Sequence, residues 1–187
     1  QRPDWEVGSI YHWGGFKDLY DGRFVDHDAH GRTEEETAAL AVDYIKTEKP
    51  AFLFVHFDNV DHVGHADGHG TPHYYEAVET ADRLIGDIRR AVNEAGIADD
   101  TVILVTSDHG GVGKGHGGET LAELEIPWIL YGAGVRPNAH LDLPISTFDT
   151  AATVAWLLGV DAPYAWLGRP IRSAMAGEAA PVQTYRT

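Results

Sequence analysis

Two apolar runs, each followed at once by a polar segment with several glycines, constrain the fold of this chain most. Residues 51–57 (AFLFVHF) and 101–106 (TVILVT) have the length and the branched or aromatic side chains of strands buried on both faces. Between them, apolar residues recur with helical spacing over residues 71–96. Because strands of this kind need helices packed on the sheet, this order predicts an α/β fold.

Further local signals fit the same architecture. Thr33 and Glu36 have the spacing of a capping box, which predicts a helix over residues 33–46, and Pro72 follows the capping residue Thr71 at the start of the helix that ends near residue 96. The other expected elements are strands over residues 8–13 and 127–131 and a helix over residues 147–158. Together they predict an α/β/α sandwich with a mostly parallel sheet and no internal domain boundary.

The two polar segments that follow the apolar runs gather acids and histidines. The first reads DHVGH at residues 61–65, and the second reads SDHGG at residues 107–111 and continues to GKGHGG at residues 113–118. Seven of the eleven histidines lie between His56 and His116. Ligands bind at the carboxyl ends of strands in open α/β sheets, and neutral imidazoles with carboxylates are ligands of divalent metals. The two segments, which we expect to be loops, therefore predict a metal site.

The spacing of these residues suggests how such a site is divided. Asp61 and His65 are four residues apart, which places both side chains on one face of a helical turn. His116 lies in a glycine-rich loop that can pass close to them, giving three protein ligands and an open fourth position, as in catalytic zinc sites. Asp108 and His109, just after residues 101–106, would begin a second site. For any one of these residues alone, a solvated position on a surface loop remains the alternative.

Other residues of the two segments are interpreted differently. His62, His69 and His73 are expected to lie behind the ligands, on the substrate side or in solvent, and His56 is expected to be an ordinary residue of the sheet. The GKGHGG stretch also fits the GxGxxG pattern of dinucleotide-binding proteins. However, it lies six residues beyond the end of residues 101–106 and no long helix is expected after it, so that reading is disfavoured.

The charge balance limits the partners of the chain. It has 14 Lys and Arg against 29 Asp and Glu, a net charge of −15, which argues against binding to nucleic-acid polymers. A small anionic substrate remains compatible with this charge, because bound metal ions reverse the local field. There is no cysteine and no apolar stretch of the roughly 20 residues that a membrane span needs. The chain opens at Gln1 without an initiator methionine, so we expect it to be part of a longer protein or a processed product.

The combined motifs resemble those of the alkaline phosphatase superfamily, in particular its type I phosphodiesterase and nucleotide pyrophosphatase branch. They are a DxxGHxxG pattern over residues 61–68, TSDHG over residues 106–110 and the GKGHGG stretch. The resemblance implies two divalent metal ions, most often zinc with manganese as the second option, beside a Ser or Thr nucleophile. It implies that the first metal is held by Asp61, His65 and His116, and that Asp108 and His109 are two ligands of the second.

The resemblance also implies that the chain is incomplete as a catalytic unit. The family's remaining second-metal Asp and its nucleophile lie on an N-terminal segment that has no counterpart here. Residues 1–174 would then be the C-terminal portion of an alkaline-phosphatase-like catalytic domain, followed by a flexible tail over residues 175–187. Strands missing from such a portion would leave an exposed sheet edge that favours association with another chain.

The expected function is metal-dependent hydrolysis of a small anionic phosphoester, either a diester or a monoester. Lys114 is a candidate contact to the substrate. Sulfatase and phosphomutase activities of the same superfamily remain alternatives, as does a non-catalytic metal-binding fragment. A periplasmic or extracellular location is implied by the resemblance alone.

Overall fold

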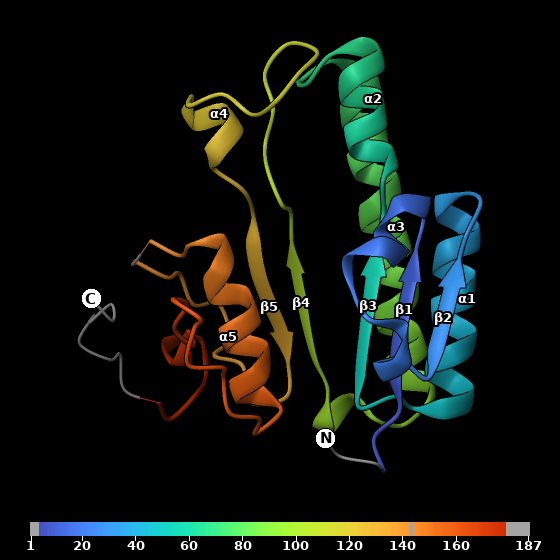
Figure 1. Ribbon diagram of the computed structural model, residues 1–187, viewed down its shortest axis with the longest axis vertical. Coiled ribbons are helices and arrows are strands. Elements are labelled where there is room, and N and C mark those ends of the chain that lie inside the picture. The colour runs from blue at the N-terminus through green and yellow to red at the C-terminus, as the bar shows by residue number, and fades with distance from the viewer. Residues whose placement is uncertain (1–3, 143, 179–187) are drawn as a thin grey trace. The chain divides into compact units, whose positions relative to one another are not determined.

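The computed structural model describes residues 4–142 and 144–178 (Figure 1). Its internal contacts divide the chain into two compact units. The first unit contains the residues up to Thr101 together with His109–Glu125, and the second contains Val102–Asp108 and the residues from Ile126 onward.

The first unit is built on a parallel sheet of three strands in the order β2-β1-β3. Its strands are β1 (Val7–Tyr11), β2 (His27–His30) and β3 (Phe52–His56). Its α-helices are α1 (Glu34–Glu48), α2 (Asn59–Asp67), α3 (Pro72–Glu94) and the short α4 (Leu121–Leu124). Three 3-10 helices complete it: η1 (Gly14–Leu19), η2 (Gly22–Phe24) and η3 (Ala98–Asp100).

Alternation along β1 and β3 decides which side chains form the core. Ile10 faces α1, is fully buried, and packs with Ala41 and Tyr44 of that helix. The opposite face of the sheet carries Phe54, on which Phe16 of η1 stacks with ring centroids 4.6 Å apart. The sheet is therefore covered by α1 on one face and partly by η1 on the other (Figure 1).

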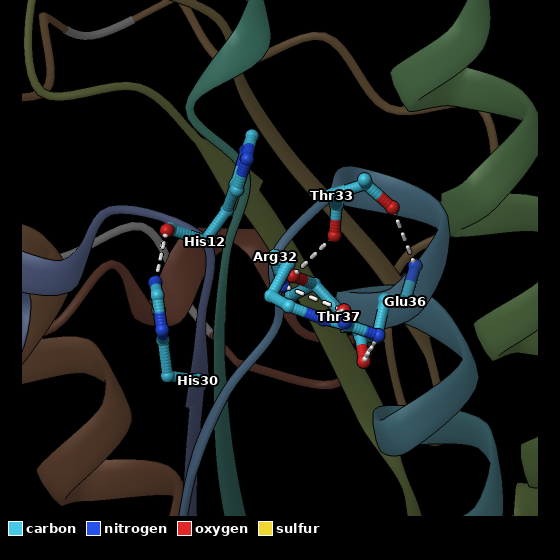
Figure 2. Close-up of polar contacts among 6 residues, drawn as sticks. All are labelled: His12, His30, Arg32, Thr33, Glu36 and Thr37. Carbon is cyan, nitrogen blue, oxygen red and sulfur yellow. Dashed lines mark hydrogen bonds and ion pairs between the residues drawn. The ribbon is translucent and has the colours of Figure 1, made fainter.

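Helix α1 begins as its capping signal predicts, with one difference (Figure 2). The Thr33 hydroxyl accepts a hydrogen bond from the Glu36 N–H at 3.1 Å. The Glu36 carboxylate, however, accepts from the Arg32 N–H at 2.8 Å and from its guanidinium, instead of returning to Thr33. Beside this turn, a ring nitrogen of His30 donates to the His12 carbonyl at 2.8 Å, which ties the ends of β2 and β1 together.

The second unit contains an antiparallel pair of strands and one α-helix. The strands are β4 (Val102–Thr106) and β5 (Trp128–Gly132), followed by α5 (Thr147–Leu157) and the 3-10 helix η4 (Arg172–Ala174). The indole of Trp128 donates to the Thr150 hydroxyl at 3.1 Å, which joins β5 to α5. The fully buried Asp149 carboxylate accepts from the Ser146 and Arg169 backbone N–H groups, which fixes the start of α5.

The predicted α/β class with a parallel sheet is confirmed, and three expectations are corrected. The first histidine segment is not a loop, because most of it forms α2. The strand β2 was not expected, since its HDAH sequence is polar. Burial of β3 on both faces is also wrong, because none of its residues is fully buried and Phe54 is 36% exposed.

Part of the tail predicted over residues 175–187 is described. Met175 forms an isolated bridge with Val135, and the Ala176 N–H donates to the Gly134 carbonyl at 2.8 Å. Residues 179–187 lie outside the described part of the chain.

Replacing Ile10 tests the core of the first unit. Ile10→Ala removes a fully buried side chain between the sheet and α1, so the free energy of unfolding should fall by about 2–5 kcal/mol, and Ile10→Val by about 0.5–1.5 kcal/mol. Urea unfolding followed by circular dichroism measures both. Leu19→Ala, at a side chain that is 66% exposed, is the control, and a loss as large as that of Ile10→Ala would contradict this account of the core.

Candidate metal site

Two predicted ligands lie on one face of α2, which starts directly after β3. Asp61 and His65 are one turn apart, and the His65 Nε2 atom lies 3.4 Å from Asp61 Oδ2. This is the arrangement expected from their spacing, and the helix makes it rigid in a way that a loop would not.

The third predicted ligand reaches α2 from the glycine-rich segment 109–118 of the same unit. The His116 Nε2 atom lies 3.8 Å from Asp61 Oδ1, and the His116 and His65 ring centroids are 5.0 Å apart. One candidate ligand atom from each of Asp61, His65 and His116 lies within 4.8 Å of the others. Among the residues that the structure describes, no other group of three such side chains meets this geometry.

Two observations show that this cluster fits a cation. Asp61 Oδ1 is shielded from solvent and has no hydrogen-bond partner among the described residues, since the His116 Nε2 atom at 3.8 Å lies beyond hydrogen-bond distance. The His65 Nδ1 lies 2.9 Å from the Lys114 carbonyl, which can only accept, so Nδ1 carries the proton. That bond leaves the His65 Nε2 lone pair directed at the cluster, as in metal-binding histidines.

The two residues predicted for a second metal follow β4. His109 belongs to the first unit, where its ring stacks on that of His116 with centroids 3.8 Å apart and its Nδ1–H donates to the Gly110 carbonyl at 2.9 Å. Asp108 belongs to the second unit, where the Ser107 hydroxyl donates to it at 3.4 Å. A second site that joins these residues stays a prediction.

The segment that carries His116 is held at its end by α4. The Gly110 N–H donates to the Glu123 carbonyl at 2.8 Å, and the Glu123 carboxylate accepts from the Gly118 N–H at 2.7 Å. The Thr120 hydroxyl and the Gly118 N–H, which both donate to it, hold the pKa of Glu123 below its usual value. The next helix after the GKGHGG stretch is α4, which spans only four residues, whereas the dinucleotide-binding pattern needs its glycines to open a longer helix.

Lys114, the predicted substrate contact, makes a hydrogen bond within the protein. Its ammonium donates to the Ala66 carbonyl in the last turn of α2 at 2.6 Å. The role of Lys114 toward a substrate therefore stays a prediction. Of the other histidines, His62 is exposed on α2 and His73 contacts Asp67 at 3.1 Å.

Glu34 supports the site in a way that sequence analysis missed. It belongs to the first turn of α1, is 3% exposed, and its carboxylate accepts from the Asn59 N–H at 3.0 Å, at the start of α2. Burial raises the pKa of Glu34, and the bond from Asn59 opposes this only in part. A sequence signal was present only as an acidic residue after the capping Thr33, which is typical of any helix start.

Comparison with known proteins identifies the family of this chain. The model of the type I phosphodiesterase / nucleotide pyrophosphatase family matches residues 7–116. The chain belongs to this family, within the alkaline phosphatase superfamily. The match includes Asp61, His65 and His116, and it confirms the resemblance seen in the motifs.

Relatives in the superfamily carry out different reactions. The chain is 27% identical to a phosphopentomutase of Alkaliphilus oremlandii over 149 residues, which cover 79% of the chain and 36% of the relative. It is 30% identical to a GPI ethanolamine phosphate transferase 3 of Schizosaccharomyces pombe over 146 residues, covering 75% of the chain and 15% of the relative. The chain therefore spans a minor part of the length of these relatives.

Solved structures support the fold. A 2-O GAG sulfatase matches with a TM-score of 0.70 at 13% identity, covering 95% of the chain and 56% of the sulfatase. Metal-dependent chemistry on phosphate or sulfate esters is the activity that these superfamily members share.

The pH dependence of stability tests the burial of Glu34. Because the pKa of Glu34 is higher in the folded chain than in the unfolded chain, its contribution to stability is present below the unfolded pKa and is lost as the pH rises through the folded pKa. Glu34→Gln does not titrate and keeps an oxygen for the Asn59 N–H. Its free energy of unfolding should therefore improve relative to wild type as the pH rises above about 4.3, the usual pKa of a Glu side chain.

Chemical denaturation at each pH measures this difference. Glu35→Gln, at the exposed neighbouring position, is the matched control and should show no such trend. A Glu34→Gln difference that does not change with pH would show that Glu34 is not desolvated as described.

Proposed function

We propose that this chain forms the first-metal part of a metal-dependent phosphoester hydrolase, with Asp61, His65 and His116 as the protein ligands. The observation that carries the proposal is their convergence around Asp61 Oδ1, a buried carboxylate oxygen without a hydrogen-bond partner among the described residues. Zinc fits a set of one carboxylate and two imidazoles best, and manganese is the second option.

The ligands and their supports have distinct roles in this proposal. A divalent cation bound there would supply Lewis-acid stabilisation of the negative charge on an ester oxygen. The chain's own residues hold the ligand atoms in place: the Lys114 carbonyl keeps His65 in the tautomer with a free Nε2, and Glu34 fixes the start of the helix that carries both Asp61 and His65. Asp108 and His109 are proposed as two ligands of a second metal.

The substrate is proposed to be a small anionic phosphoester, either a diester or a monoester. Turnover would also need a Ser or Thr nucleophile and a further second-metal Asp supplied by sequence outside these 187 residues. The short span of the chain relative to its relatives supports this part of the proposal.

Other ester chemistries and a non-catalytic role are the alternatives. A steryl-sulfatase of Rattus norvegicus is 28% identical over 165 residues, covering 73% of the chain and 28% of the sulfatase, so a sulfate ester is the second candidate substrate. A phosphomutase or a metal-binding fragment without activity would use the same three ligands.

Association with another chain is a further part of the proposal. Phe54 on the edge strand β3 is 36% exposed, and Ile129 and Tyr131 on one face of β5 are 56% and 53% exposed. Exposed apolar strands of this kind favour pairing with further strands.

Within residues 4–142 and 144–178, none of the helices has the length and apolar character needed to cross a lipid bilayer.

Metal analysis of His116→Ala tests the three-ligand site. Wild-type protein should bind at least one equivalent of zinc or manganese. His116→Ala should lower the metal affinity by more than about 100-fold, because losing only a residue that hydrogen-bonds to a metal ligand already lowers metal affinity by about 10–100-fold. Elemental analysis and competition with a chromophoric chelator measure this, and circular dichroism checks the fold. His62→Ala, an exposed histidine of α2, is the matched control. Unchanged occupancy in His116→Ala would remove His116 from the ligand set.

Ester assays test the substrate class and the requirement for further sequence. Nitrophenyl phosphate, bis-nitrophenyl phosphate and nitrophenyl sulfate should each give negligible turnover with the metal-loaded chain alone, because the proposed nucleophile lies elsewhere. Initial rates at saturating metal measure this, with Asp61→Asn as the blank. Rapid turnover of any of the three esters that is lost in Asp61→Asn would show that the chain carries its own nucleophile, and the preferred ester would then give the substrate class.

A further inference from the structure

The three candidate ligands come from two segments that are far apart in the sequence. Asp61 and His65 are fixed by α2, whereas His116 lies on a segment in which Gly113 and Gly117 have positive φ values of 57° and 93°. Local structure alone therefore does not hold His116 beside α2. Besides their hydrogen bonds with Glu123 of α4, residues 109–118 make contacts with α2.

Lys114 makes two such contacts with the end of α2. Its backbone carbonyl accepts from His65 Nδ1–H at 2.9 Å, and its ammonium donates to the Ala66 carbonyl at 2.6 Å. Carbonyls in the last turn of a helix lack partners within the helix, and a positive charge there is favourable. The ammonium thus satisfies the helix end while the carbonyl of the same residue orients a candidate ligand.

His69 makes a second set of contacts, two residues after the end of α2. Its backbone N–H donates to the Gly113 carbonyl at 2.7 Å, and its Nδ1–H donates to the same oxygen at 3.1 Å. The ring lies against two glycines from the two segments that it joins. A Cβ added at Gly64 would lie 2.5 Å from His69 Nε2, and a Cβ added at Gly111 would overlap the ring.

We propose that His69 and Lys114 are positioning residues that dock residues 109–118 on α2 and so hold His116 at ligand distance from Asp61 and His65. The proposal deepens the proposed metal site and rests on it for its effect on metal affinity. It gives Lys114 a role within the protein in place of contact with a substrate.

The physical consequence is preorganisation. If the segment is docked before a cation binds, the conformational entropy of ordering it is not subtracted from the binding free energy. Without the docking contacts, His116 would have to be ordered during binding, and the metal affinity would fall even though all three ligands are present.

Metal titration of the full chain tests this with His69→Ala and Lys114→Met. Each should weaken zinc binding by about 10–100-fold, the range observed when outer partners of metal ligands are removed. Lys114→Arg keeps a cation for the Ala66 carbonyl and should recover most of the affinity. The matched controls are His140→Ala and Lys17→Met, at exposed positions outside α2 and residues 109–118, and both should bind zinc as wild type does.

A double-mutant cycle separates positioning from a general loss of stability. In a His116→Ala background, Lys114→Met should have little further effect on zinc affinity, because the ligand that it positions is gone. Additive effects of the two substitutions would overturn the proposal, as would wild-type affinity in both His69→Ala and Lys114→Met.

Amide hydrogen exchange of the metal-free protein gives a readout that does not depend on the metal. Residues 110–118 should exchange faster in both docking variants, with exchange in β1 and α1 unchanged. If wild-type protein bound no metal while the two docking variants showed this faster exchange, the proposed metal function would fail and the docking would stand. Unchanged exchange over residues 110–118 would overturn the docking itself.

Discussion

The parallel pairing of β1 with β3 is the constraint on which the candidate site depends. It sets the position of β3, and α2 starts directly after that strand. In the same sheet, Ile10 packs against Ala41 and Tyr44 of α1. The first turn of α1 then brings Glu34 to the Asn59 N–H. The helix that carries two candidate ligands is therefore anchored by the strand before it and by a carboxylate from another helix.

The site combines a rigid helix with a segment that is docked on it. Two carboxylate oxygens near this arrangement are unsatisfied: Glu34 Oε2 and Asp61 Oδ1 are both buried without a hydrogen-bond partner among the described residues. An unsatisfied buried polar group costs about 1–3 kcal/mol, and more if it is charged. At Asp61 a bound cation would offset this cost, whereas at Glu34 burial raises the pKa of the carboxyl.

Local chemistry made much of the fold predictable. Thr33 and the Thr71–Pro72 pair mark helix starts that the structure confirms, because capping depends on neighbouring residues alone. The sequence of α2 was interpreted as a loop, since Asp, His and Gly are poor helix formers. Its helix is stabilised by the contact from Glu34 and by the segment docked on its end, and neither contact has a local signal. The strand β2 was not predicted either, because its Asp28 accepts hydrogen bonds from the Tyr11 and Tyr20 hydroxyls, contacts for which the local sequence gives no signal.

The sequence by itself determined the family, the α/β class and the one-turn spacing that places Asp61 beside His65. These features depend on residue identities and on short-range geometry, which the order of residues specifies directly. Only the tertiary structure brought His116 to that pair and showed the contacts that His69, Lys114 and Glu34 make around it. Each of these contacts joins residues far apart in the chain, and its geometry follows from how the sheet, α2 and the glycine-rich segment pack, which no local spacing specifies.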